Sequence, residues 1–203
     1  MADHDRLGDE PDSDQVEVRK QKLARLRAAG VEPYPNDFKP SHSASEIVST
    51  FADASDQALA EAPKDLRVAG RIVAIRRMGK ASFFHIQDRR GRLQVYIQQN
   101  RVGEEAYGLF RTVDVGDIVG LRGYLIRTRT HELTLEAEGL RLLAKCLRPL
   151  PEKWHGLSDI EARYRQRYLD LMVNPEARHV FEKRSRIIRG IRQFFEQRDF
   201  LEV

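Results

Sequence analysis

The sequence contains a single cysteine, Cys146, and this scarcity limits both how the fold is held together and what chemistry it supports. One cysteine excludes an intramolecular disulfide and is typical of a reducing compartment. Cys146 lies in the segment LLAKCLRPL, which contains no histidine or acid, so a nucleophilic role is not expected. A hydrophobic content of 41% fits a globular protein with a packed core.

Long hydrophobic runs are also missing. No apolar run approaches the roughly 18 residues that a membrane span needs. The N-terminal segment MADHDRLGDEPDSD is acidic and lacks the apolar stretch of a signal peptide. We therefore expect a cytoplasmic protein with no membrane partner.

Charge of both signs is abundant but unevenly distributed. Residues 1–62 contain 7 basic and 13 acidic side chains, whereas residues 63–203 contain 28 basic and 18 acidic ones. A basic body behind an acidic N-terminal region suits a polyanionic partner such as nucleic acid. An ordinary solvated surface is the alternative reading of the same charges.

The N-terminal region divides into an acidic tail and a helical arm. Residues 1–13 are predicted to be disordered, and residues 14–62 to form a basic helix and an arm. Ser13 is the expected cap of a helix through Ala29, and residues 44–62 read as a short helix followed by a loop. The first helix either is a solvated surface helix or lies along a nucleic-acid backbone. Its basic residues are Arg19, Lys20, Lys22, Arg25 and Arg27.

Residues 63–146 change to the period of two that is typical of β-strands. The predicted fold is mainly β with flanking helices, and its centre is a five-stranded OB-fold barrel. Gly70, Gly120 and Gly123 indicate bulges or sharp bends. A generic small β-barrel is the alternative, but a helix between the third and fourth strands favours the OB-fold. The expected strands are 66–78, 82–88, 92–97, 118–128 and 132–144, with the helix at 102–113.

The hairpin of the second and third strands has two unusual faces. One face is apolar and belongs in the core. The opposite face carries two aromatic side chains among amides and an imidazole, namely Phe83, Tyr96, Gln94 and His85. An OB-fold binds single-stranded nucleic acid across this face, where aromatic rings stack on bases and amides read base edges. Alternatively, Phe83 and Tyr96 cover a flank of the barrel that packs on the N-terminal helices.

The C-terminal region starts with a predicted linker over residues 147–157, which contains Pro149 and Pro151. Ser158 and Glu161 then form a potential capping box, and Pro175 suits the first position of a further helix. That helix carries a mostly apolar face made of Val180, Arg184, Ile187, Ile188, Ile191, Phe194 and Phe195.

Three segments carry a resemblance to a known family. RRMGKASFFHIQDRRGRLQVYI, LRLLAKCLRPLPEKWHGL and EARYRQRYLDLMVNPEAR resemble class II lysyl-tRNA synthetases (lysine–tRNA ligases) of bacterial type. The resemblance runs from about Arg19 to the last residue, and RPLPEKWHGLSDIEARYRQRYLDL is its most specific part. Aspartyl-tRNA and asparaginyl-tRNA synthetases share the OB-fold but match the sequence of this linker segment poorly.

The resemblance implies that the barrel binds the anticodon loop of lysine tRNA. By this resemblance, Phe83 stacks on the central uridine of the anticodon and Gln94 reads its edge. Arg76, near the end of the first strand, and Glu132, in the loop before the last strand, are implied as further anticodon contacts. His131 stands where the family often has glycine.

The resemblance also implies that residues 158–203 are the first helices of a truncated class II catalytic α+β domain, ending inside the first signature motif. Asp199 stands in a turn where glycine is usual. The complete enzyme would be a homodimer that uses ATP and Mg²⁺ to attach lysine to its tRNA through lysyl-adenylate. This chain is expected to bind no cofactor, to hold no catalytic or metal-binding residue, and to be inactive alone.

Two other functions remain open from the sequence. One is a free-standing OB-fold module that binds RNA or single strands without synthetase activity. The other is a dimerisation module, because residues 176–203 present a large apolar helix face. The Arg-rich segment ARYRQRYLDL, which is predicted to be helical, and the C-terminal segment that resembles the first signature motif favour a synthetase.

Overall fold

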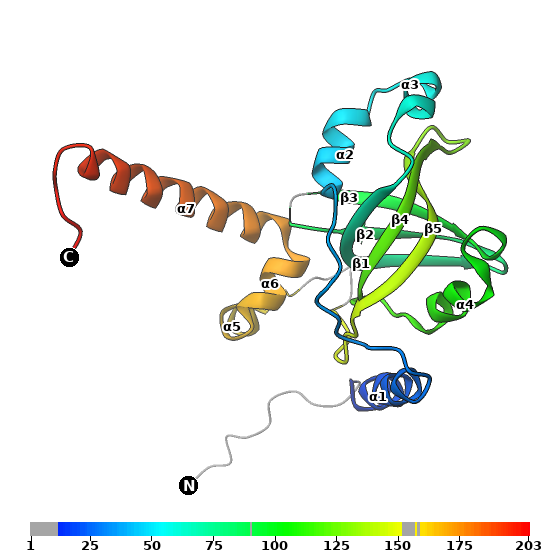
Figure 1. Cartoon of the computed structure of the whole chain (residues 1–203). Helices are drawn as coiled ribbons and strands as arrows, with labels where there is room; N and C mark the ends of the chain where they lie inside the picture. Colours follow the sequence, from blue (N-terminus) through cyan, green and yellow to red (C-terminus); the bar gives the residue numbers. More distant parts are fainter. Residues whose placement is uncertain (1–11, 90, 152–156, 158) are drawn as a thin grey trace, which may run out of the picture. The chain divides into compact units, whose positions relative to one another are not determined.

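A computed structural model describes residues 12–89, 91–151, 157 and 159–203. The chain forms two compact units, Met1–Pro149 and Leu150–Val203. The boundary between them falls within the segment predicted as a linker. Each unit is described separately, and Figure 1 labels the helices and strands of both.

The first unit contains a closed five-stranded barrel. Its strands follow the order β1-β2-β3-β5-β4, and β4 pairs with β1 to close it. The β3–β5 pair is parallel, whereas the other pairs are antiparallel. This topology and the helix between β3 and β4 confirm the predicted OB-fold. The strands are β1 (Leu66–Met78), β2 (Ala81–Gln87), β3 (Arg92–Gln98), β4 (Ile118–Arg127) and β5 (Leu133–Ala144).

The barrel interior is filled by alternate residues of the strands. Phe84 and Ile86 of β2 are buried, as are Leu93, Val95 and Ile97 of β3. Tyr107 and Phe110 of helix α4 (Gln99–Thr112) join the same core. Helix α4 starts before the predicted helix at 102–113, and Gly103 interrupts it with a φ of +85° that favours glycine.

Three register shifts in the described strands let them curve around the barrel. Two lie in β4, one between Ile118 and Val119 and one between Arg122 and Gly123, where a β-carbon on Gly123 would collide with the carbonyl oxygen of Glu136. In β1 the shift lies between Ile72 and Ala74, and not at Gly70 as the sequence suggested. Gly70 instead allows the close approach of Ile86, whose β-carbon would be 3.0 Å from an added β-carbon.

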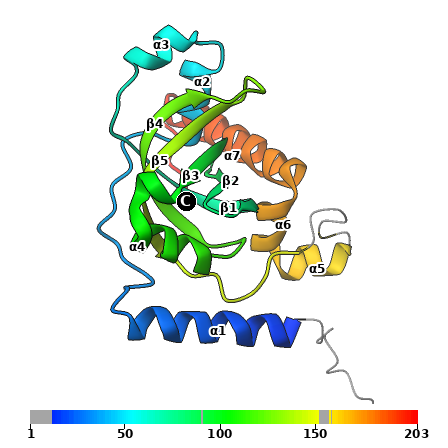
Figure 2. The same cartoon turned by 90° about the vertical axis from the view of Figure 1, so that its right-hand side faces the viewer.

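The N-terminal helices lie at opposite ends of the barrel, with α1 (Asp12–Ala28) at one end and α2 (Ala44–Phe51) and α3 (Asp56–Glu61) at the other (Figure 2). Helix α1 already includes Ser13, so the expectation that Ser13 caps it from outside is wrong. Helix α3 occupies part of the predicted loop, because the Ser55 side chain caps it by accepting from the Ala58 amide. Of the predicted acidic tail, residues 1–11 lie outside the described residues.

The second unit is helical and consists of α5 (Ile160–Arg165), α6 (Arg167–Val173) and α7 (Pro175–Glu196). Pro175 takes the first turn of α7, as predicted. The predicted cap Ser158 lies outside the described residues, and Asp159 caps α5 by accepting from the Ala162 amide. Asp199 has a φ of +60°, the left-handed conformation that aspartate tolerates better than most residues.

Asp170 ties the helices of the second unit together. Its carboxylate is buried and accepts hydrogen bonds from Arg163, Arg167 and Asn174. Burial raises the pKa of Asp170, but these hydrogen bonds outweigh it and leave the pKa below its usual value. The apolar face of α7 remains exposed at Val180, Ile187, Ile191, Phe194 and Phe195. Among the described residues, no helix has the length and apolar character to cross a membrane.

Candidate nucleic-acid interface

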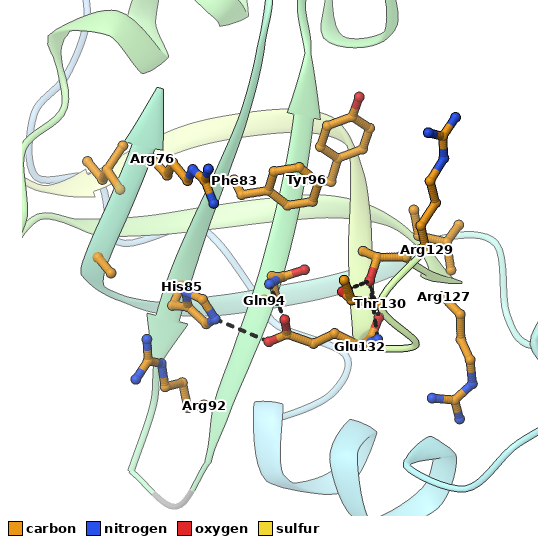
Figure 3. A pocket seen from close by; sticks show the side chains of 14 residues that line it. Arg76, Phe83, His85, Arg92, Gln94, Tyr96, Arg127, Arg129, Thr130 and Glu132 are labelled. Carbon is orange, nitrogen blue, oxygen red and sulfur yellow. Dashed lines mark hydrogen bonds and ion pairs between the residues drawn. The ribbon is translucent and has the colours of Figure 1, made fainter. Parts of the chain in front are cut away.

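Strand register brings the predicted recognition residues side by side on the outer face of the barrel. Phe83 of β2 pairs with Tyr96 of β3, and His85 pairs with Gln94. Arg76 of β1 lies opposite Phe83. Figure 3 shows them around one cavity, together with residues of the β4–β5 loop such as Glu132. The structure therefore brings together all six residues expected to contact the anticodon.

Two aromatic rings form one part of this cavity. The rings of Phe83 and Tyr96 are stacked, with centroids 4.5 Å apart and planes inclined by 22°. Both side chains are half-buried and line the cavity, whose other walls come from the strands and the β4–β5 loop. They therefore face a cavity and not the N-terminal helices, so the alternative reading of this face is wrong. An aromatic pair of this kind is a stacking platform for a base.

Glu132 organises the polar part of the cavity (Figure 3). Its carboxylate accepts from Gln94 Nε2 at 2.5 Å and contacts His85 Nε2 at 3.3 Å. Thr134 Oγ1 donates to Gln94 Oε1 at 2.7 Å. The amide of Gln94 is thus fixed, with its amino group toward Glu132 and its carbonyl toward Thr134. Each end keeps a second hydrogen-bonding position for a bound group.

A tight turn between β4 and β5 delivers Glu132 to this position. Thr128 N donates to Glu132 O at 3.1 Å, and His131 N donates to Thr128 O at 2.9 Å. His131 has a φ of +61°, in the left-handed region that most side chains avoid. Histidine therefore keeps a turn geometry that glycine would adopt more easily, and Glu132 still reaches the cavity.

Exposed arginines surround the cavity. Arg76, Arg92 and Arg129 line it and are exposed, whereas Arg127 is half-buried. Guanidinium groups bind phosphate oxygens through charge-assisted hydrogen bonds. The arrangement places a stacking pair and an oriented amide within a positively charged rim. Arg92, Arg127 and Arg129 were not identified from the sequence, where nothing distinguished them from other surface arginines.

The basic residues of α1 divide into two groups. Arg19 is only 8% exposed and donates to the carbonyl of Cys146 at 3.0 Å. Lys22 forms an ion pair with Asp114 at 2.5 Å. These two side chains are used within the unit, which argues against the backbone-binding role suggested for them. Lys20, Arg25 and Arg27 are exposed.

A buried charge network lies where Lys22 of α1 contacts the barrel. The ammonium of Lys145 has no exposed surface and contacts Asp117 at 2.7 Å and Asp114 at 2.6 Å. Asp117 also accepts from the amides of Cys146 and Asp114. Burial raises the pKa of Asp114, but hydrogen bonds from Lys145 and Lys22 outweigh it and lower the pKa. Spacing along the sequence does not predict this network, because Lys22, Asp114 and Lys145 are far apart in the chain.

Within the described part of the chain, no group of three or more histidine, cysteine or acidic side chains has the arrangement of a metal site. The side chains that line the cavity supply stacking rings, hydrogen-bonding groups and arginine charges, which are groups that suit recognition.

Comparison with known families agrees with this arrangement. Residues 66–143 match the family described as OB-fold nucleic acid binding domain. Residues 159–203 match the family of class II tRNA synthetases for aspartate, lysine and asparagine. The two matches fall on the barrel and on the helical unit, respectively.

Curated relatives extend the similarity to nearly the whole chain. The chain is 52% identical over 194 residues to the lysine–tRNA ligase of Moorella thermoacetica, covering 96% of this chain and 38% of that protein. It is 50% identical over 188 residues to that of Carboxydothermus hydrogenoformans, covering 93% and 37%. It is 52% identical over 191 residues to that of Xylella fastidiosa, covering 93% and 38%. The chain thus spans less than two fifths of the length of these relatives.

Proposed function

We propose that this chain, a relative of the class II lysine–tRNA ligases over nearly its whole length, is the part of such an enzyme that recognises the anticodon of lysine tRNA. The observation that carries the proposal is the fixed amide of Gln94 next to the stacked pair of Phe83 and Tyr96. One base of a single-stranded loop stacks on the aromatic pair, and its edge meets the amide.

The orientation of Gln94 suits a uracil base. Uracil presents an N–H group beside a carbonyl oxygen, so Gln94 Oε1 accepts from the base and Gln94 Nε2 donates to it. Glu132 and Thr134 occupy the other hydrogen-bonding position at each end of the amide. The amide therefore does not have to be reoriented when the base binds, and its fixed orientation favours uracil over bases with another hydrogen-bonding pattern.

The arginine rim provides the contact with the phosphate backbone. Arg76, Arg92 and Arg129 are exposed around the cavity, and they suit the phosphates that flank a splayed base. Because such contacts release counterions, affinity should fall steeply as the salt concentration rises. Affinity that does not depend on salt would argue against the rim as the docking surface.

The parent activity would be the ATP- and Mg²⁺-dependent attachment of lysine to tRNA, and this chain would contribute recognition to it. We expect lysine-dependent exchange of pyrophosphate into ATP to stay at background with this chain alone. Phosphoryl chemistry needs preorganised cations around the nucleotide, whereas the arginines described above surround a cavity whose aromatic pair and amide suit a base. Exchange above background would show that a nucleotide site has been overlooked.

The exposed face of α7 supports a homodimer. Ile187 and Ile191 are 62% and 52% exposed on this helix, and large apolar patches commonly mark association surfaces. Light scattering should therefore show concentration-dependent association of the chain, and a variant with both Ile187→Glu and Ile191→Glu should remain monomeric. A monodisperse monomer of the unaltered chain would contradict this part of the proposal.

Base discrimination tests the main proposal. The chain should bind an RNA hairpin with a UUU loop more tightly than the same hairpin with a UCU loop, in a fluorescence titration at fixed salt. Gln94→Ala should reduce the difference, whereas Gln15→Ala, a change at an exposed amide of α1, should leave it unchanged. Equal affinity of the unaltered chain for both loops would instead favour a free-standing, non-specific RNA-binding module.

A further inference from the structure

Among the described residues, Arg127, the last residue of β4, donates its hydrogen bonds to backbone carbonyl oxygens alone. Its Nε donates to Ala54 at 3.1 Å, and its Nη1 to His131 at 3.1 Å. Its Nη2 contacts the carbonyls of Phe51, Ala52 and Ala54 at 3.3, 2.6 and 2.7 Å. One guanidinium thus joins two segments that are more than 70 residues apart in the sequence.

The first of these segments is the C-terminal end of helix α2. The last carbonyls of a helix lack partners within the helix, and a cation is favourable there because of the helix dipole. The other end of α2 is held by the barrel in a complementary way, because the Asp88 carboxylate accepts from the Ala44 amide at 2.6 Å. Arg127 and Asp88 therefore clamp this short helix at its negative and positive ends.

The second segment is the β4–β5 turn. Arg127 holds the carbonyl of His131, the residue with left-handed backbone that directly precedes Glu132. Glu132 in turn holds the amino group of Gln94. A continuous series of contacts therefore leads from the end of α2, through one guanidinium and one carboxylate, to the amide that faces the bound base.

We propose that Arg127 is a positioning residue for base discrimination. It sets the place of Glu132, and thereby the orientation of Gln94, without touching the RNA. The inference rests on the proposed function and adds a residue outside the aromatic and amide contacts. Arginine suits this role because its planar fork of five donors spans several carbonyls at once, whereas lysine presents a single ammonium.

Arg129 provides a matched comparison. It lies two residues away in the same turn and lines the same cavity, but it is exposed. In Figure 3 the two side chains extend in different directions from the turn, Arg129 on the side of the aromatic pair and Arg127 away from it. A role in phosphate binding therefore suits Arg129, and a role in positioning suits Arg127.

The experiment compares Arg127→Gln with Arg129→Gln by titration of UUU-loop and UCU-loop hairpins over a range of salt. Arg127→Gln should lower the UUU/UCU affinity ratio roughly fivefold, equivalent to one lost hydrogen bond. Its salt dependence should stay as in the unaltered chain. Arg129→Gln should weaken both hairpins alike and reduce the salt slope by about one. The inference is overturned if Arg127→Gln keeps the ratio, or if it behaves as expected for Arg129→Gln.

A second measurement does not depend on RNA. In ¹⁵N-labelled chain, the side-chain amide signals of Gln94 should shift in Arg127→Gln and in the milder Arg127→Lys, but not in Arg129→Gln. If Arg127→Gln does not fold, Arg127→Lys takes its place in both measurements. Unchanged Gln94 signals would overturn the inference. Absent discrimination by the unaltered chain would instead refute the proposed function, and the two failures are therefore distinguishable.

Discussion

Two carboxylate centres in the first unit illustrate opposite uses of charge. Asp117 has no exposed side-chain surface and is bound by Lys145 and by backbone amides. Glu132 has 49% of its side chain exposed and is bound by Gln94 and His85 at the edge of a cavity. Both carboxylates hold other groups in place. The first holds Lys145 and the backbone of Asp114 and Cys146, which α1 contacts through Lys22 and Arg19, whereas the second prepares a surface for a ligand.

The two centres differ in whether any hydrogen-bonding position remains available to a ligand once the contacts within the protein are made. At the buried centre, Lys145 contacts two aspartates and Lys22 completes the network, so its charges serve the fold alone. At the exposed centre, the amide of Gln94 still has a donor and an acceptor position. In this chain, a carboxylate contact therefore suggests a binding surface where its partner keeps hydrogen-bonding capacity next to solvent, as Gln94 does beside Glu132.

Removing the buried cation should have the largest effect on stability. Lys145→Met leaves Asp117 buried without its partner, which typically costs about 3–5 kcal/mol. Unfolding in urea should show this loss, whereas Lys20→Met on the exposed face of α1 should change stability by no more than about 0.5 kcal/mol. If both variants unfold at the same urea concentration, the network is not what anchors this end of the barrel.

Removing the half-buried ring of Phe83 from the cavity should weaken RNA binding and spare the fold. Phe83→Ala should lower affinity for the UUU hairpin by about 1–3 kcal/mol, as for one stacked base. Phe200→Ala, a change at an exposed ring of the second unit, serves as the control. Equal affinities of the two variants would show that Phe83 does not stack on RNA.

Lowering the pH should destabilise the fold, because Asp114 of the buried charge network becomes protonated. Its folded pKa lies below the ordinary value, so the ionised form contributes stability above the unfolded-state pKa. That contribution is lost as the pH falls through the folded pKa. The free energy of unfolding should therefore decline with acid in this window, and Asp114→Asn should make the decline shallower. If the free energy of unfolding falls equally steeply with acid in the unaltered chain and in Asp114→Asn, Asp114 is not the group responsible.

A substitution in the turn before Glu132 should have the smallest effect, and it should affect stability without affecting base discrimination. His131→Gly should raise stability by about 0.5–1 kcal/mol, because glycine adopts the left-handed conformation without steric strain. The UUU/UCU affinity ratio should be kept, since the backbone that carries Glu132 is unchanged. Thr130→Gly, at a neighbouring position without positive φ, should not stabilise the chain. A loss of discrimination in His131→Gly would show that the imidazole itself contributes.

The strands of the barrel and the two faces of the β2–β3 hairpin could be predicted from the spacing of apolar residues alone. Successive side chains of a strand alternate between faces, so an inward-facing Phe84 predicts that Phe83 points outward. The structure confirms that Phe84 is buried. The same alternation places Gln94 and Tyr96 on the outer face of β3. Only local spacing is needed for these statements, and they could therefore be made before any contact was known.

Which charged groups meet became visible only in the folded chain. Arg19 reaches a carbonyl 127 positions away, and Lys22 reaches an aspartate 92 positions away, so two cations of a basic helix are internal. Arg127 became notable only when folding brought the end of α2 to the β4–β5 turn. Periodicity reports which face a residue occupies, whereas the partner on that face depends on strand order and on how distant segments pack.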